Sequence, residues 1–524
     1  MSDDLTNPLF NDFISNLGKI NKVDEAGEKI HIDELAGNVY FVYEKMRNAV
    51  EYQEQHLFRR SAIERLIKRT VFVNENDLKG LSKSIIKELI KTRYLENNTL
   101  PISTIETVDK ILSRYHSLFV EIKNKEMTNN KNHLHNILMM AACEIENAIW
   151  SYAEEQIYLD FVYKNFCSAI ETDVKEDRDS SLVAIYFAVH RSLWKSDKYT
   201  INYYLYRSFF PDWFKSDGSS SDKFVDSYIS FSEHIEKITA SAIYSRINKI
   251  VRKNIAPYRI IRIALIEKKK FEDINDPDAF MNKINLVLKN EYLKTKQRTN
   301  RKIIQAIIYI FLTKVLLALI LEFPYDYFVN GSINYVPLII NLLFPPAYMF
   351  LLASLIPSPG KRNTQEINTR IESIIYKNTS GKKFKVSGAE SRTNVGIVLL
   401  YIFTFIISFL LSIYLLYILQ FNIVSGLIFF IYFSTVTYFG YRISQGAREY
   451  SLIDEKKSIR EALLDFFTFP FIKLGRWLGD KYANLNIIAF VLDYMIEMPL
   501  KTVLIFFENW SSMINKEKED LLDR

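Results

Sequence analysis

The residue with the most unusual chemical setting in this chain is Lys314. It lies near the middle of an apolar stretch that runs from Ile303 to about Phe323. A charged side chain costs ~2.5 to 3.5 kcal/mol at the centre of a membrane helix, so such a residue is a candidate functional site. Glu322 follows at the far end of the same stretch, and Asn341 lies in the next apolar stretch. Two interpretations stay open: a structural polar clamp between membrane helices, or a site that binds an ion or solute.

Two consecutive prolines, Pro345 and Pro346, follow Asn341 in the second apolar stretch. Proline has no N–H, so these residues free the carbonyl groups of Asn341 and Leu342. We expect a helix break here, and the free carbonyls could accept hydrogen bonds from Lys314. A broken helix beside a buried ammonium group is typical of transporter binding sites.

Other patterns predict no chemistry. No HExxH motif occurs, and within the helices that we predict no histidine has a second ligand at i+3 or i+4, the spacing that helical metal sites require, so no metal site or cofactor is expected. Gly360-Lys361 resembles the end of a phosphate-binding loop, but Leu355 occupies the place of its first glycine. The two cysteines, Cys143 and Cys167, lack CxxC spacing and indicate a reducing compartment. No catalytic motif is found.

Four apolar stretches must position Lys314 and its neighbours. Each is about 20 residues long, which as a helix matches a hydrocarbon core of ~30 Å. We therefore predict an all-α polytopic membrane protein. The expected spans are 303–323, 336–356, 395–419 and 423–441.

The third span carries three small hydroxyl side chains at successive i+4 positions, Thr404, Ser408 and Ser412. Such a stripe allows another helix to pack closely. The fourth span offers Gly426, Ser434 and Thr435 as possible partners, and the short connection between the two spans predicts a tight antiparallel hairpin.

Lysine and arginine alternate around the spans. They are numerous before the first span, between the second and third, and after the fourth, and absent from the other two connections. The positive-inside rule then places both termini in the cytosol, in the plasma (inner) membrane if the source is a prokaryote. The acidic N-terminus, with no apolar run, predicts no cleaved signal peptide.

Residues 1–300 show helical periodicity and are expected to form a large cytosolic helical domain, irregular rather than a solenoid. Asp276-Pro277 is a typical helix start. The helices that we predict span Asn38–Val71, Leu81–Tyr94, Ile105–Lys123, His133–Phe166, Leu182–Trp194, Val225–Arg252 and Asp278–Thr295.

The end of this domain, Lys249 to Lys302, is rich in basic residues. Two explanations stay open: recognition of anionic lipid headgroups, or the ordinary positive-inside bias. Nucleic acid is not expected as a partner, because no recognition module accompanies the charge and a membrane is adjacent.

Residues 446–524 are amphipathic, with several phenylalanines among charged residues. Ile487 to Phe507 nearly reads as a fifth span, but Asp493, Glu497 and Lys501 lie on one helical face. This stripe favours helices that lie in the membrane interface or dock on the cytosolic domain. We thus divide the chain into a cytosolic domain (1–300), a membrane domain (301–445) and C-terminal amphipathic helices (446–524).

These features support a membrane scaffold or regulatory protein whose cytosolic domain binds protein partners. The alternative is a small-solute or ion transporter or channel with a site near Lys314, and a membrane-bound enzyme ranks third. Scaffold and transporter differ in whether Lys314 faces a dry helix contact or a water-filled cavity.

Overall fold

A computed structural model describes most of the chain. The described residues are 6–19, 28–32, 55–73, 80–125, 130–172, 178–216, 222–267, 274, 276–329, 331, 335–356, 359–376, 383–386, 395–453, 459–485, 510 and 513–514. The predicted all-α class is confirmed, since strands occur in this part of the chain only as two short segments, β1 and β2. The predicted amphipathic segment 487–507 lies outside the described residues, as does 38–54 of the first predicted helix.

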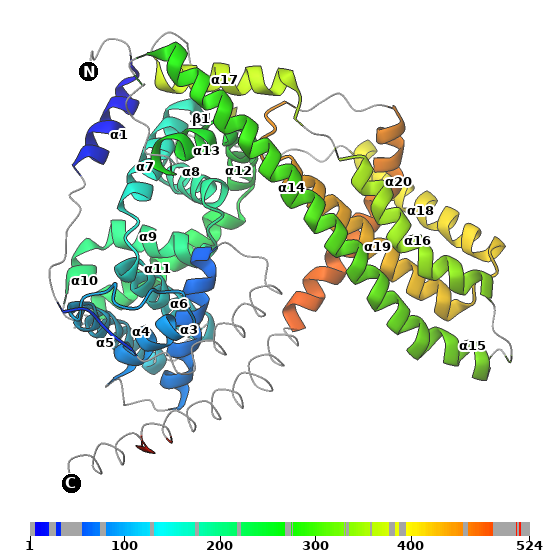
Figure 1. Cartoon of the computed structure of the whole chain (residues 1–524), viewed down its shortest axis with the longest axis horizontal. Helices are drawn as coiled ribbons and strands as arrows, with labels where there is room; N and C mark the ends of the chain where they lie inside the picture. Colours follow the sequence, from blue (N-terminus) through cyan, green and yellow to red (C-terminus); the bar gives the residue numbers. More distant parts are fainter. Residues whose placement is uncertain are drawn as a thin grey trace. The chain divides into compact units, whose positions relative to one another are not determined.

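The chain divides into two compact units (Figure 1). The first, which we call the N-terminal unit, comprises Thr6–Ile255 together with the segment that holds β2. The second comprises Ala256–Gly381 and Ala389–Ile487, and we call it the membrane unit because it holds the helices that are predicted to cross a membrane. The division falls at Ala256, whereas we predicted a boundary at 300, and it groups α20 (Ile459–Leu485) with the predicted membrane helices instead of in a separate C-terminal part.

The N-terminal unit is a set of helices with buried aromatic side chains. Phe13 of the first helix stacks on Phe161 with ring centroids 5.1 Å apart, which attaches α1 to α7. The elements are α1 (Pro8–Gly18), α3 (Gln55–Val73), α4 (Leu81–Lys91), α5 (Ser103–Asn124), α6 (Asn130–Ile149), α7 (Ala153–Ala169), β1 (Ile170–Thr172), α8 (Arg178–Leu193), α9 (Lys198–Phe209), α10 (Pro211–Lys215), α11 (Asp222–Ala240), α12 (Ala242–Asn254) and β2 (Phe384–Val386).

Two long helices that we predicted are each divided in two. The 133–166 helix ends at Ile149 and resumes at Ala153, because Arg59 holds the connection: its Nη2 donates to Tyr152 Oη at 2.7 Å, and its guanidinium lies 4.6 Å from the Trp150 ring centroid. The 225–252 helix is interrupted at Ser241, whose hydroxyl accepts the Tyr244 N–H as an N-cap. These side-chain contacts outweigh the continuous helical pattern of the sequence.

β2 comes from the connection between the second and third membrane helices, yet it pairs in parallel with β1. Ile170 lies opposite Phe384 in the register, and Lys383 Nζ donates to Glu171 Oε1 at 2.8 Å. Neither strand was predicted, because three residues are too few to show strand alternation.

Among the described residues, four helices are long and apolar enough to cross a membrane, and all four belong to the membrane unit. Its elements are α13 (Ala256–Arg262), the π-helical segments η1 (Ile263–Glu267) and η2 (Ala318–Glu322), α14 (Pro277–Leu317), α15 (Phe323–Val329), α16 (Tyr335–Ser354), α17 (Lys361–Ile375), α18 (Val395–Ile418), α19 (Ile423–Ala447) and α20 (Ile459–Leu485).

The helix expected at 278–295 is continuous with the first span, because α14, of 41 residues, runs on through η2 into α15 to form one helical stretch of 53 residues from Pro277 to Val329. Its start agrees with the prediction: the Asp276 carboxylate accepts the N–H groups of Asp278 and Ala279, and Pro277 occupies the first turn. No proline or glycine follows in α14, so nothing in the sequence ends the helix before the apolar stretch begins.

Candidate functional site in the membrane unit

A π-helical segment brings Lys314 and Glu322 to the same side of the first span. In a regular α-helix, residues eight apart differ by about 80° around the axis. The segment η2 contains a wider turn, in which the Phe323 N–H donates to the Ala318 carbonyl. A wide turn absorbs about one residue, so Glu322 comes nearly into line with Lys314. Their pairing therefore depends on this segment, which the sequence analysis did not predict.

The Lys314 side chain is wholly buried, with 0% of its surface exposed, and it is paired. Its Nζ donates to Glu322 Oε1 at 2.7 Å, and Glu322 is itself only 1% exposed. The ammonium group also lies 4.7 Å from the ring centroid of Tyr432 on α19, which is cation–π geometry. Lys314 is thus held by a carboxylate and a ring.

Asn341 connects this ion pair to two other helices. From α16, its Nδ2 donates to Glu322 Oε2 at 3.0 Å and to the Ser425 carbonyl of α19 at 3.1 Å. Its Oδ1 is buried and has no hydrogen-bond partner among the described residues. The three predicted site residues, Lys314, Glu322 and Asn341, therefore form one network that joins the first, second and fourth membrane helices.

A second polar contact stabilises the same helices near the predicted outer end. Asn422 Nδ2 donates to Asp326 Oδ1 at 2.6 Å, while Asn422 Oδ1 accepts the Ser425 N–H at 2.7 Å as the N-cap of α19. We did not predict Asp326, Asn422 or Tyr432 as site residues. An asparagine directly before an apolar helix is a typical N-cap and could have pointed to Asn422.

Pro345 and Pro346 do not interrupt the second span. The helix α16 runs through both residues from Tyr335 to Ser354, so the break that we predicted there is not present. Each proline removes one backbone hydrogen bond, but neighbouring helices in a membrane can hold such a helix together. Phe344, directly before the prolines, and Tyr348, two residues after them, both pack on Phe433 of α19, at 5.9 and 5.0 Å between ring centroids.

Two residues of the hydroxyl stripe on α18 are buried, Thr404 and Ser408, and Ser412 is partly buried. Thr404 Oγ1 donates to the Leu400 carbonyl and Ser412 Oγ to the Ser408 carbonyl, both at 2.8 Å. α18 packs against α20, which we did not predict as its partner, and Ser434, which we predicted as a possible partner of the stripe, lies against Gly475 of α20.

α20 packs closely on α19 through two glycines. A Cβ added to Gly475 would lie 2.1 Å from the Ser434 carbonyl oxygen, and one added to Gly479 would lie 3.4 Å from the Tyr438 ring. One turn away, Phe471 is 2% exposed and packs on Phe433 at 4.5 Å between centroids. Glycines four positions apart allow such close helix contact. Figure 1 shows α20 running across α19 instead of alongside it.

On the basic side of the spans, Asn363 of α17 organises a hydrogen-bonded hub. Its Nδ2 donates to Tyr292 Oη at 2.9 Å and to the Tyr450 carbonyl at 2.7 Å, and its Oδ1 accepts the Leu452 N–H at 2.7 Å. Tyr450 Oη in turn donates to Glu291 at 3.2 Å. The hub connects α14, α17 and the segment that follows α19.

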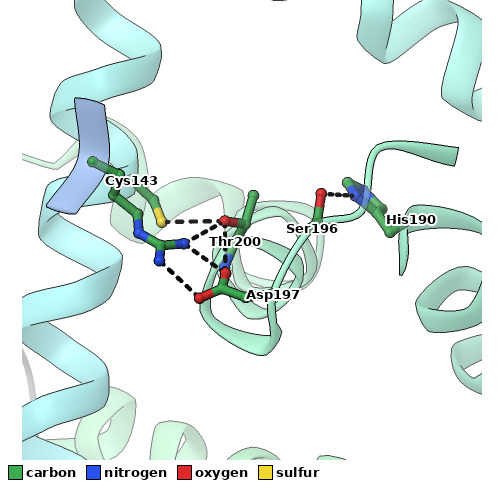
Figure 2. Close-up of polar contacts among 6 residues, drawn as sticks. Cys143, His190, Ser196, Asp197 and Thr200 are labelled. Atoms are coloured by element: carbon green, nitrogen blue, oxygen red, sulfur yellow. Dashed lines mark hydrogen bonds and ion pairs between the residues drawn. The ribbon is translucent and has the colours of Figure 1, made fainter. Parts of the chain in front are cut away.

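The N-terminal unit contains a second polar cluster, whose residue types resemble a Cys-His-Asp set (Figure 2). Cys143 Sγ lies 3.9 Å from Thr200 Oγ1, whereas His190 Nδ1 lies 3.5 Å from Ser196 Oγ on the other side of Asp197. Burial raises the pKa of the Cys143 thiol to about 12 and lowers that of His190 to about 3. The cysteine stays a thiol and the histidine neutral, so the cluster is suited to packing and not to nucleophilic catalysis.

The buried His190 leads to a pH prediction. The unfolded chain binds a proton at His190 below about pH 6.5, and the folded chain does not until about pH 3. The contribution of His190 to the free energy of unfolding is therefore fully present above about pH 6.5. As the pH drops from there towards 3, the free energy of unfolding falls by up to ~1.4 kcal/mol per pH unit. In His190→Phe this part of the pH dependence is expected to disappear, as measured by unfolding free energies between pH 4 and 8.

Exposed His234 of α11 provides the matched control. His234→Phe should retain the pH dependence of the parent protein. An unchanged slope in His190→Phe would show that His190 does not titrate as its burial implies.

No group of three or more metal-ligating side chains is present among the described residues.

No family model, curated protein or solved structure matches this chain.

Proposed function

We propose that this protein is a membrane-anchored scaffold or regulatory protein, whose N-terminal unit binds protein partners in the cytosol. The observation that carries the proposal is the closed network of Lys314, Glu322 and Asn341. Each of the three side chains is at most 1% exposed, and their contacts join three membrane helices. A buried ion pair connects the helices that carry it, and removing one of its two partners is strongly destabilising because the other charge stays buried.

The apolar layer beside this network supports the same interpretation. Ile310, Met349 and Val436, from three different helices, form a buried cluster. Gly440 of α19 allows Leu352 of α16 to come close, since a Cβ at that position would lie 2.7 Å from Leu352 Cδ1. Tight helix packing on these faces favours a rigid anchor.

The topology that we propose has both termini in the cytosol. In a variant without Cys143 and Cys167, single cysteines at Ser332 and Asn422 should react with an impermeant thiol reagent applied from outside intact cells. Cysteines at Ser380 and Ser511 should react only after permeabilisation. The expectation follows from the distribution of basic residues. Labelling of Ser511 from outside would instead indicate a fifth span.

The test of the scaffold function compares permeability with partner contact. Proteoliposomes of the full chain should leak protons and potassium no faster than those of Lys314→Met/Glu322→Gln. In native membranes, photocrosslinkers at the exposed Ile102 and Phe209 of the N-terminal unit should give discrete protein adducts, and a crosslinker at lipid-facing Leu410 should not. A flux that the double variant abolishes, or no adduct from either position, would overturn the proposal.

A transporter or channel is the second candidate, and two observations favour it. The π-helical segment η2 lies directly between Lys314 and Glu322, and such segments often occur at functional sites. In addition, the buried Asn341 Oδ1 has no hydrogen-bond partner among the described residues, so it could accept a bond from a solute or water. The flux measurement above distinguishes this candidate from the scaffold.

A further inference from the structure

We infer that α20 is an in-plane membrane helix whose outward face binds anionic phospholipid headgroups at the basic ends of the spans. The inference concerns a surface that the proposed scaffold function does not use, and it does not rest on that function.

The level of α20 along the spans is given by its contacts. Gly475 and Gly479 lie against Ser434 and Tyr438, and Tyr438 is about one helical turn before Arg442 at the basic end of α19. Lys473 lies 4.2 Å from the ring centroid of Tyr401, which is in the second turn of α18. Both contacts are within ~10 Å of where the apolar stretches end, the depth at which interfacial helices are buried.

The inner and outer faces of α20 differ in chemistry. The inner face is apolar or small and is covered, since Phe471 packs among Phe409, Phe430 and Phe433 at centroid distances of 5.1, 6.2 and 4.5 Å. The outer face combines cations with an exposed tryptophan. It carries Lys473, Arg476, Trp477 and Lys481, with Asp480 as the single acid in this stretch.

The outer face is also accessible. Trp477 is 56% exposed and the Arg476 side chain 72% exposed, and the nearest carboxylate oxygen of Asp480 lies 3.7 Å from Arg476 Nε. An exposed ion pair of this kind is weak and leaves the guanidinium able to bind a phosphate. Tryptophan is enriched at the headgroup level, and lysine and arginine extend from buried stems towards it.

Anionic phospholipid is the occupant that fits these features best. A helix at the level of the span ends has lipid as its neighbour, and several cations on its free face complement a negative headgroup. The exposed Leu463 and Phe469 of the same helix, at 55% and 40%, would contact acyl chains.

The test measures which lipid lies beside Trp477 in the full-length protein. Proteoliposomes of phosphatidylcholine contain 20% of a brominated lipid, either phosphatidylglycerol or phosphatidylcholine, and the signal of Trp477→Phe is subtracted to isolate Trp477. We expect brominated phosphatidylglycerol to quench Trp477 at least about twofold more strongly than brominated phosphatidylcholine, and this preference to fall at high salt.

Charge variants show whether the preference comes from α20. In the triple variant Lys473→Gln/Arg476→Gln/Lys481→Gln, the two brominated lipids should quench Trp477 equally. Because Lys473 also packs on Tyr401, Arg476→Gln/Lys481→Gln is a second variant that keeps this contact and should lose most of the preference. Lys83→Gln/Lys87→Gln, at exposed positions of α4, should keep it.

Three results would overturn the inference. Equal quenching by the two lipids in the parent protein would remove the headgroup preference. Absence of quenching by either lipid would show that α20 is not at the membrane. A preference unchanged in both charge variants would assign it to another part of the protein.

Discussion

Lys314→Met is expected to lower the free energy of unfolding by about 3 to 5 kcal/mol, because it leaves the Glu322 carboxylate buried without its cation. Glu322 is 1% exposed, and its carboxylate would keep the hydrogen bond from Asn341 but lose the one from the ammonium group. Glu322→Gln should be destabilising for the converse reason, since it leaves the Lys314 ammonium beside a neutral amide. Equilibrium unfolding in mixed micelles measures both.

The double variant Lys314→Met/Glu322→Gln should be more stable than the sum of the single losses predicts. Removing both charges also removes the cost of burying them, so we expect a coupling energy of several kcal/mol. Lys296→Met, at an exposed position of the same helix, is the control and should change stability by less than about 0.5 kcal/mol.

Additive losses would contradict the role of the ion pair as a connector. Single variants that keep full stability but abolish a cellular phenotype would place the transporter or channel first among the candidate functions.

Gly475→Ala is expected to detach α20 from α19. The added methyl group would lie 2.1 Å from the backbone carbonyl oxygen of Ser434, and a backbone atom cannot move aside as a flexible side chain can. Overpacking of this kind typically costs 1 to 3 kcal/mol, so the contact should be lost locally. Hydrogen exchange measures the effect: amides of α20 should lose protection by at least about tenfold.

Two glycines provide graded controls for this experiment. Gly446→Ala makes the same change on α19, where no atom lies within 4 Å of the added Cβ, and should keep the protection of α20. Gly479→Ala, at 3.4 Å from the Tyr438 ring, should have an intermediate effect. Full protection in Gly475→Ala would show that the close contact between α20 and α19 does not exist in solution.

The long apolar helices were predictable because each depends mainly on its own residues. About 20 apolar residues determine a membrane helix whatever its neighbours are, and α16, α18 and α19 begin at or within one residue of the predicted positions. The all-α class follows in the same way from helical periodicity. The helix start at Asp276-Pro277 was also correct, since an N-cap acts over a few residues.

The places where the predictions were wrong depend on contacts between distant residues. The division of 133–166 into α6 and α7 depends on Arg59, which lies far earlier in the chain. The continuity of α16 through Pro345 and Pro346 agrees with packing on Phe433 of α19. A pattern within one segment does not contain this information.

By itself the sequence determined that the chain has four apolar helices, that a lysine lies within the first, and that Glu322 and Asn341 could reach it. These follow from hydrophobicity and from the high cost of a charge in lipid. The tertiary structure alone decided how they meet: a π-helical turn brings Glu322 into line with Lys314, Asn341 connects them to α19, and α20 packs on α19 at Gly475. Such contacts depend on backbone geometry and on helices far apart in the chain, and neither can be predicted from the periodicity within one segment.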